Sequence, residues 1–233
     1  MMNMLSIRYR YLCRITLFGL LILFFPPQVC TAGEMRRLLE PAEQRVLFQR
    51  LKKVQKNIKT LQAEFSEQRK IASLTTPLYF KGQLYYAREG LFFMAYNDPI
   101  HYILRVKEGE ALFYVDGSPT ADVVNISNIK GLAGHADLFA WNPEGFTGKV
   151  WEDDKGYRLE EKSEKAADHQ KGNRLHMLLD KQTLMVKYIR IADGSGDITE
   201  ITLSAIEIDL DLPMHVIEFT LPEGIRLNRL DQP

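Results

Sequence analysis

The residue types that most often carry out catalysis are present in this sequence, but very little in their spacing resembles a catalytic motif. Ser195 lies between two glycines in "DGSGD", a segment typical of a hairpin turn and not of the strand–turn–helix that exposes a nucleophilic serine. No glycine-rich phosphate loop with a lysine is present, which argues against use of ATP. The five histidines are scattered, without metal-ligand spacing to another histidine, a cysteine or a carboxylate: His101, His135, His169, His176 and His215. We therefore predict no enzyme activity, no metal ion and no cofactor.

The feature that remains is an excess of apolar and aromatic side chains. The segment "GQLYYAREGLFFMAYNDP", residues 82–99, is typical of two strands joined at Glu89-Gly90, with Arg88 at the bend. Apolar residues fall on both faces of these strands. They indicate either ordinary core packing or a hollow lined with aromatic rings that accepts a hydrophobic ligand.

Residues 1–32 have the three-part form of a secretory signal peptide. Three arginines without an acidic residue precede an uncharged, strongly apolar run of eleven, residues 15–25, and "PPQVCTAGE" then ends in small residues. Eleven residues are too few to span a bilayer. We predict cleavage before Gly33, a periplasmic location, and one domain over 33–233. Lipidation at Cys30 and a retained anchor are the alternatives, although valine before Cys30 fits a lipidation site poorly.

The exported chain would have no disulfide and no basic surplus. Both cysteines, Cys13 and Cys30, lie in the signal segment, so an apolar core must hold the domain together. Cleavage removes three of the 30 Lys and Arg residues and none of the 30 Asp and Glu residues, which leaves a net charge of about −3. This composition argues against nucleic-acid binding and against electrostatic attachment to a membrane. We expect a monomer.

One helix and many short strands account for most of the remaining sequence. Residues 41–61 are predicted as a helix, because Leu47, Leu51, Val54, Ile58 and Leu61 repeat at spacings of four and three. Short segments rich in Tyr, Phe, Ile and Val are predicted as strands: 62–71, 78–87, 91–97, 100–107, 110–116, 119–126, 149–153, 156–162, 173–180, 184–192, 197–210 and 214–220.

The strands should pair antiparallel, because no helix long enough for a parallel crossover separates them. In 197–210 the apolar residues change phase, which predicts a bulge near Ala205–Ile206. Residues 125–146 interrupt the strands with apolar residues typical of one or two short helices, ending at Asn142-Pro143. A large antiparallel sheet must cover its apolar face, either by curling into a barrel or by using such helices as a lid.

Several motifs in this order resemble the LolA family of lipoprotein carriers. The opening segment matches the family at Gly82, Leu84, Arg88, Phe92 and Pro99. "LQAEFSEQ" (61–68), "VDG" (115–117) and "FTLPEGIRL" (219–227) match further family segments, so that the resemblance runs from about 45 to 227. The sequence departs from the family at Glu67, Glu89 and Met94, and "GLFF" is closer to a divergent LolA-like branch.

The resemblance implies a mainly β fold with few helices, a curved, unclosed antiparallel β-barrel of about 11 strands under a helical lid (LolA/LolB-like). Family members hold acyl chains in the barrel, and the arginine at the position of Arg88 latches the lid by donating to its backbone carbonyls. Here the partner would lie within 128–141. The lid residues would be Ile129, Leu132, Leu138, Phe139 and Trp141. The acyl-chain cavity residues would be Phe65, Phe80, Leu84, Tyr86, Phe92, Met94, Tyr102, Leu104 and Phe113.

The function implied is a periplasmic carrier that shuttles acylated lipoproteins from the inner to the outer membrane. Each buried methylene contributes about 0.8 kcal/mol, so an exposed acyl chain cannot cross water unaided at a useful rate. The implied partners are an inner-membrane lipoprotein-releasing ABC transporter and an outer-membrane LolB-type acceptor. The alternative is a LolA-like lipid-binding accessory or sensor protein of a glycolipid or polyene export system.

Overall fold

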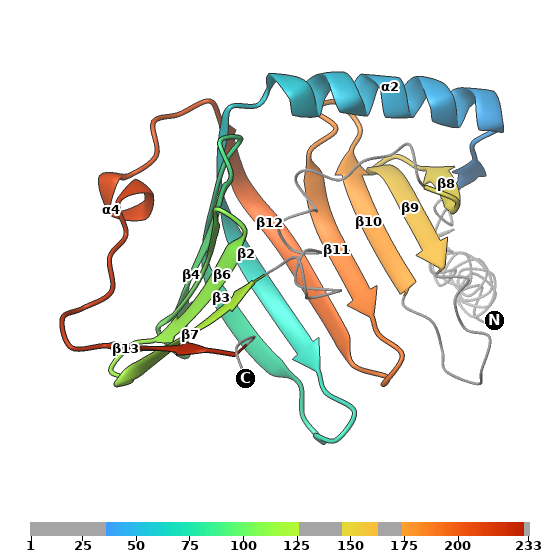
Figure 1. The fold of residues 1–233 in the computed structure, drawn as a ribbon. Helices are drawn as coiled ribbons and strands as arrows, with labels where there is room; N and C mark the ends of the chain where they lie inside the picture. Colours follow the sequence, from blue (N-terminus) through green and yellow to red (C-terminus); the bar gives the residue numbers. More distant parts are fainter. Residues whose placement is uncertain (1–35, 126–145, 163–173, 231–233) are drawn as a thin grey trace, which may run out of the picture. The chain divides into compact units, whose positions relative to one another are not determined.

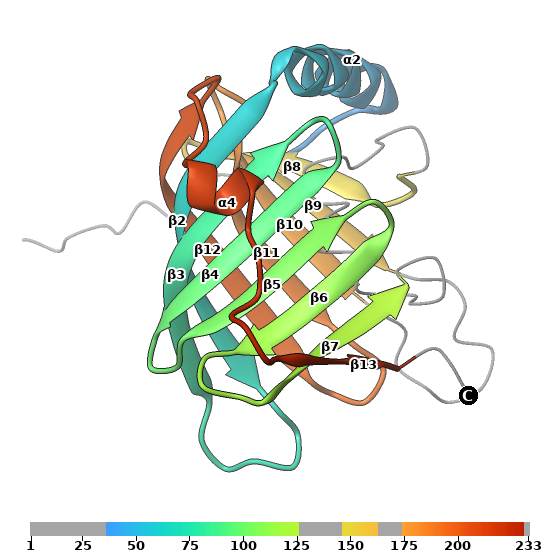
Figure 2. The same cartoon turned by 60° about the vertical axis from the view of Figure 1, so that its left-hand side comes forward.

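The computed structural model describes residues 36–125, 146–162 and 174–230, and within them the chain is mainly β. One thirteen-stranded sheet has the order β1-β8-β9-β10-β11-β12-β2-β3-β4-β5-β6-β7-β13, with two helices beside it. The sheet curves round but does not close, since β1 and β13 lie at its two edges (Figures 1 and 2). The predicted fold class, an unclosed curved sheet, is confirmed.

The element bounds follow the predicted strands closely in the middle of the chain. They are β1 Arg37–Leu38, α2 Pro41–Asn57, β2 Thr60–Lys70, β3 Leu78–Ala87, β4 Leu91–Asp98, β5 Tyr102–Lys107, β6 Glu110–Val115, β7 Thr120–Asn125, β8 Lys149–Glu152, β9 Gly156–Lys162, β10 Arg174–Asp180, β11 Val186–Ala192, β12 Ile198–Ile208, α4 Met214–Ile217 and β13 Arg226–Arg229. The predicted bulge in β12 is confirmed. The register with β2 shifts between Ser204 and Glu207, and Ala205 has a φ of 47°.

Helix α2 is shorter than predicted at its C-terminal end. It begins with a capping box between Glu40 and Glu43, but it ends at Asn57 and not at residue 61. Leu61 belongs to β2, where every second side chain points inward. Its agreement with the helical spacing of the preceding leucines is a coincidence. The backbone N–H of Lys59 donates to the Asp209 carboxylate at 2.7 Å, which fixes the chain where helix passes into strand.

Two further predictions near the C-terminus are wrong. The predicted strand 214–220 is the one-turn helix α4, and its Val216 packs against the outside of the sheet. Strand β13 then pairs parallel with β7, whereas all pairs were expected to be antiparallel. The chain crosses the outer face after β12 and so reaches β7 running in the same direction (Figure 2).

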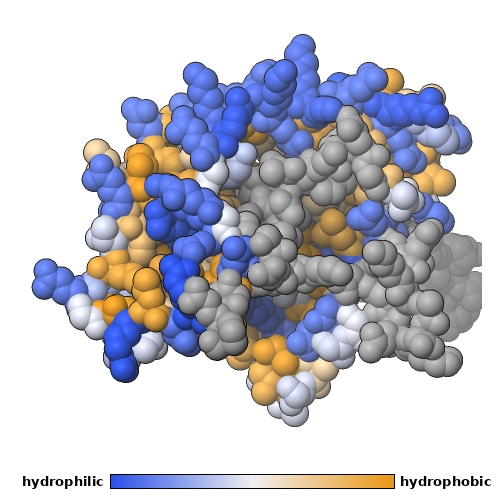
Figure 3. Space-filling view, viewed as in Figure 1, coloured by the Kyte–Doolittle hydropathy of each residue, from blue (hydrophilic) through white to orange (hydrophobic). Residues whose placement is uncertain are grey.

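The two faces of the sheet are covered differently. The segment that contains α4 packs on the convex face against Phe93 and Tyr85. Helix α2 lies over one end of the concave face, along the upper ends of the strands in Figure 1. Its hydrophilic side points outward, and hydrophobic residues are visible in parts of the hollow beneath it (Figure 3). We call two groups of concave-face residues the helix-covered core and the concave aromatic cluster. The helix-covered core comprises Leu39, Leu47, Leu51, Val150, Tyr157, Leu159, Met177, Leu179, Leu184 and Ile189.

Candidate functional site

The concave aromatic cluster lies mainly on β2 to β6, with further members from β12 and the end of α2, and brings together all nine predicted cavity residues. Its buried members are Ile58, Leu61, Ala63, Phe65, Leu84, Phe92, Met94, Tyr96, Leu104, Val106, Ala111, Ile201 and Leu203. Its half-buried members include Phe80, Tyr86, Tyr102 and Phe113. That these side chains contact a ligand remains a prediction.

The antiparallel register explains why residues distant in sequence meet here. Leu84 pairs with Met94, Met94 with Leu104, and Leu104 with Phe113, so that one row of inward side chains crosses four strands. Residues directly opposite on one face lie close enough to pack. Alternation along each strand then places every second residue on the same concave face.

Gly82 makes room for an aromatic ring in this cluster. It lies opposite Phe65, and a β-carbon at position 82 would approach the Phe65 ring to 2.7 Å and the Ala95 carbonyl oxygen to 2.0 Å. Any side chain at position 82 would therefore displace the Phe65 ring or the neighbouring strand. The ring packs edge-on against Tyr96 at 4.8 Å between centroids.

A hollow of about 350 Å³ opens beside this cluster. Its apolar lining includes Tyr102, Leu104 and Phe113, and its charged lining includes Glu67 and Arg69. A second hollow of about 200 Å³ shares Arg69, Tyr96 and Tyr102 and is also lined by Phe80. The larger volume lies within the range of small-molecule sites, and the mixture of apolar walls with a few polar groups is typical of them.

Sequence reasoning missed the charged group at the edge of this cluster. The Arg69 Nε donates to Glu67 Oε1 at 2.5 Å, the Tyr96 hydroxyl donates to Glu67 Oε2 at 2.7 Å, and the Arg69 guanidinium donates to the Tyr96 hydroxyl oxygen at 3.2 Å. The Glu67 side chain is fully buried, and that of Arg69 is 37% exposed. The signal was available, because Phe65, Glu67 and Arg69 share one face of a strand.

Burial and neighbouring charges shift the pKa values of the side chains around Glu67. Burial raises the pKa of Tyr96, and the negative charge of Glu67 raises it further. Burial likewise raises the pKa of Tyr102, so both phenols stay protonated and serve as neutral hydrogen-bonding groups. For Arg69, burial opposes the charge, but the hydrogen bond and attraction to Glu67 outweigh it and raise the guanidinium pKa.

Arg88, the predicted lid latch, lies where the β3–β4 hairpin meets the end of α2. Its guanidinium donates to the backbone carbonyls of Ile58 and, at 3.4 Å, Gln55. Its backbone N–H donates to the Lys59 carbonyl at 2.9 Å. Free carbonyls at a helix C-terminus are the acceptors expected for this arginine, but here they belong to α2. The predicted partner range 128–141 and all five predicted lid residues lie outside the described residues, so the lid latch remains a prediction.

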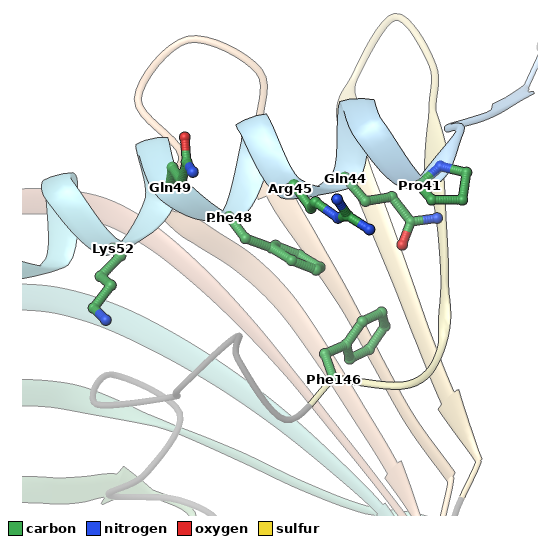
Figure 4. Close-up of a pocket in the computed structure, with 7 residues that line it drawn as sticks. All are labelled: Pro41, Gln44, Arg45, Phe48, Gln49, Lys52 and Phe146. Atoms are coloured by element: carbon green, nitrogen blue, oxygen red, sulfur yellow. The ribbon is translucent and has the colours of Figure 1, made fainter.

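Two other hollows lie away from the concave aromatic cluster. One of about 450 Å³ runs beside α2, where the rings of Phe48 and Phe146 meet edge to face with their centroids 5.6 Å apart (Figure 4). The other, of about 790 Å³, is the largest of the four and lies between Arg88, Lys107 and the apolar residues Leu210, Met214 and Ile217. It was not predicted, because Met214 and Ile217, which close one side of it, lie in the segment 214–220 that was predicted as a strand.

Some kinds of site are absent from the part of the chain that the structure describes. No three His, Asp or Glu side chains lie together there in a way that could hold a metal ion. Within the same ranges, neither helix is long and apolar enough to cross a membrane. The predicted signal peptide lies in residues that the structure does not describe.

Comparisons with known proteins give distant likenesses only. No family model matches the sequence, and neither does a curated protein. The chain is similar to a DUF1329 family protein from Desulfovibrio piger (13% identity, 76% of this chain and 97% of that chain, TM-score 0.46). It is similar to a LolA superfamily protein from Nitrosomonas europaea (8% identity, 73% of this chain and 94% of that chain, TM-score 0.41). It is also similar to the Mycobacterium tuberculosis lipoprotein LppX (10% identity, 75% of this chain and 99% of that chain, TM-score 0.39). Likenesses this distant carry no argument about function.

Proposed function

We propose that this protein is a periplasmic carrier that binds the acyl chains of lipoproteins in a hydrophobic cavity and shuttles them from the inner to the outer membrane. The observation that carries the proposal is the concave aromatic cluster with its adjoining hollow. The nine side chains that the LolA resemblance assigns to the cavity lie on one face of one curved sheet. Four of these nine are only half-buried, so the described protein leaves part of their surface available to a ligand.

The magnitudes suit a carrier. Transfer of about ten methylenes of an acyl chain from water to this face would contribute on the order of 8 kcal/mol, before the entropy of binding is subtracted. Such an interaction holds a lipid in transit and still permits release to an acceptor that binds it more tightly. The transport partners, a releasing ABC transporter and a LolB-type acceptor, belong to this proposal and rest on the sequence resemblance.

A second candidate function is favoured by the charged group at the edge of the cavity. The lipid part of a lipoprotein presents neutral ester and amide groups, whereas Glu67 and Arg69 place charges beside the apolar walls. This arrangement suits a free lipid with a charged headgroup. The second candidate is therefore a lipid-binding accessory protein of a lipid export system.

Native mass spectrometry of the protein purified from the periplasm of its own host tests both candidates. A co-purifying acylated lipoprotein supports the first, and a free lipid adduct supports the second. Bare protein that also fails to bind the neutral fluorescent probe N-phenyl-1-naphthylamine would contradict both, because the aromatic side chains would then serve only as core.

A further inference from the structure

We infer that Arg69 is the headgroup-binding residue of the cavity and that the ligand is an amphiphile with an oxyanion, a carboxylate or phosphate, directly beside its acyl chain. This inference rests on the proposed binding of acyl chains and names the class of ligand. A free acidic lipid, the cargo of the second candidate, has this chemistry.

The position of Arg69 is the first argument. It lines both hollows, and so it lies where the charged wall meets the apolar walls formed by Tyr102, Leu104, Phe113 and Phe80. A chain that lies along these walls would bring its headgroup to the arginine. The Arg69 side chain is still 37% exposed, which leaves it accessible to a ligand.

The second argument is the remaining hydrogen-bonding capacity of the guanidinium. Of its five N–H donors, one is directed to Glu67 and one to Tyr96. Among the described residues, the other three have no hydrogen-bond partner in the protein. Oxyanions match a planar guanidinium better than other ligands do, because they accept two parallel, charge-assisted hydrogen bonds.

The third argument is that the side chain is held in place before a ligand arrives. The guanidinium carbon lies 5.0 Å from the centroid of the Phe80 ring and 5.9 Å from that of Tyr96. The hydrogen bond to Glu67 fixes the guanidinium at its Nε atom. An arginine positioned by two rings and a buried carboxylate loses little freedom on binding, which favours affinity.

The neighbouring charged side chains are less suited than Arg69 to bind the headgroup, because they already have partners in the protein. Lys70 also lines the larger hollow, but its ammonium nitrogen lies 3.9 Å from the Glu200 carboxylate and so already has a counter-charge. Asp197 accepts from the backbone N–H of Ala72 at 2.8 Å. A fully buried Glu67 paired with a partly buried Arg69 would be costly as mere packing, because apolar residues of the same size often stabilise a fold as well or better.

Displacement of N-phenyl-1-naphthylamine from the full exported chain tests the inference. The ligands are tetradecanoic acid, monotetradecyl phosphate and methyl tetradecanoate, which share one chain length and differ in the headgroup. For the wild-type protein, we expect at least one of the two anions to bind with a Kd about tenfold lower than that of the ester. The anion that binds tighter identifies the headgroup.

Variants at position 69 test whether the preference for an anionic headgroup over the ester depends on Arg69. Arg69→Met should reduce the ratio of anion to ester affinity to about one and leave the ester affinity within about twofold. The double variant Glu67→Leu with Arg69→Met should do the same without leaving a buried charge unpaired, which covers the case in which the single variant fails to fold. Arg190→Met is the matched control, since Arg190 also pairs with a glutamate, at 3.3 Å, and is 30% exposed. It lies on the opposite face from Ile189 and should keep the wild-type ratio.

Two results would overturn the inference. In the first, the ester binds the wild-type protein as tightly as both anions. In the second, folded Arg69→Met and the double variant keep the wild-type ratio. In either case binding of the probe and ester would leave the proposed function standing. If neither the probe nor any of the three ligands binds, the proposed function fails and this inference fails with it.

Discussion

The two halves of the concave face show how one sheet can serve as core in one region and as a binding wall in another. In the helix-covered core, Leu47 and Leu51 of α2 pack onto aliphatic residues such as Leu159, and all three are at most 3% exposed. In the concave aromatic cluster, Tyr102 and Phe113 are only half-buried and a charged pair lies among the rings. Closely packed aliphatic side chains favour stability, whereas partly open aromatic walls leave room for a ligand.

The largest expected effect separates stability from binding. Leu51→Ala, in the helix-covered core, should lower the free energy of unfolding by about 3 kcal/mol, because it leaves a cavity where α2 packs on the sheet. Urea denaturation measures this loss. The affinity for N-phenyl-1-naphthylamine should remain within about twofold. A loss of binding with little loss of stability would reverse the roles assigned to the two regions.

A slightly smaller effect is expected for the charged pair. Glu67→Gln should cost about 2 kcal/mol of unfolding free energy, because Arg69 would lose its counter-charge while remaining partly buried. The cost stays below that of a wholly buried pair, since water still reaches the arginine. Glu64→Gln is the matched control, because Glu64 is exposed on the other face of the same strand and should cost less than about 0.5 kcal/mol. Equal costs in urea denaturation would show that the pair has no special role.

The helix-covered half should also carry a distinct sensitivity to acid. Asp180, the last residue of β10, accepts hydrogen bonds from Lys187, Gln182 and Thr183, and these lower its carboxyl pKa well below the ordinary 3.8. A lowered pKa contributes stability that is present above pH 3.8 and is lost as the pH falls below it. Asp180→Asn should cost about 1 to 2 kcal/mol at pH 7 and progressively less below pH 4.

Urea denaturation of both proteins between pH 7 and pH 2.5 checks this expectation. Asp154→Asn serves as the control, because Asp154 is exposed. A cost that stays constant down to pH 2.5 would contradict the lowered pKa.

The smallest expected effect on stability concerns Arg88, which joins the hairpin of the aromatic half to the end of α2. Arg88→Leu should leave the protein folded and cost about 0.5 to 1 kcal/mol, since the lost bonds are to carbonyls at a helix end. If the proposed lid latch also exists, the variant should bind an acylated ligand but release it more slowly to an acceptor vesicle. Release at the wild-type rate would exclude the latch.

The sequence was most informative where strands follow one another through short turns. Alternation and turn residues located the strands from β2 to β7 to within two residues, and the phase change at Ala205 located the bulge. The errors arose where local pattern and tertiary packing disagree. Leu61 fits both a helical and a strand period, and the apolar residues near Val216 pack on the outside of the sheet as a helical turn.

The site was predictable in its apolar part and missed in its polar part. Membership of the nine cavity residues follows from family resemblance and alternation. Glu67 was noted only as a departure from the family pattern and Arg69 was not singled out, because their pairing with Tyr96 depends on a register between β2, β3 and β4 that composition alone does not determine.

The central claim is that acyl chains bind the concave aromatic cluster and not the helix-covered core. Photolabelling with a diazirine analogue of tetradecanoic acid, followed by peptide mapping, tests this most directly. Our account predicts labels within residues 60–115, reduced by an excess of unlabelled acid, with few or none within 149–162 and 174–192. Competed labels confined to α2, β8 to β11 or the convex face around α4 would contradict the account.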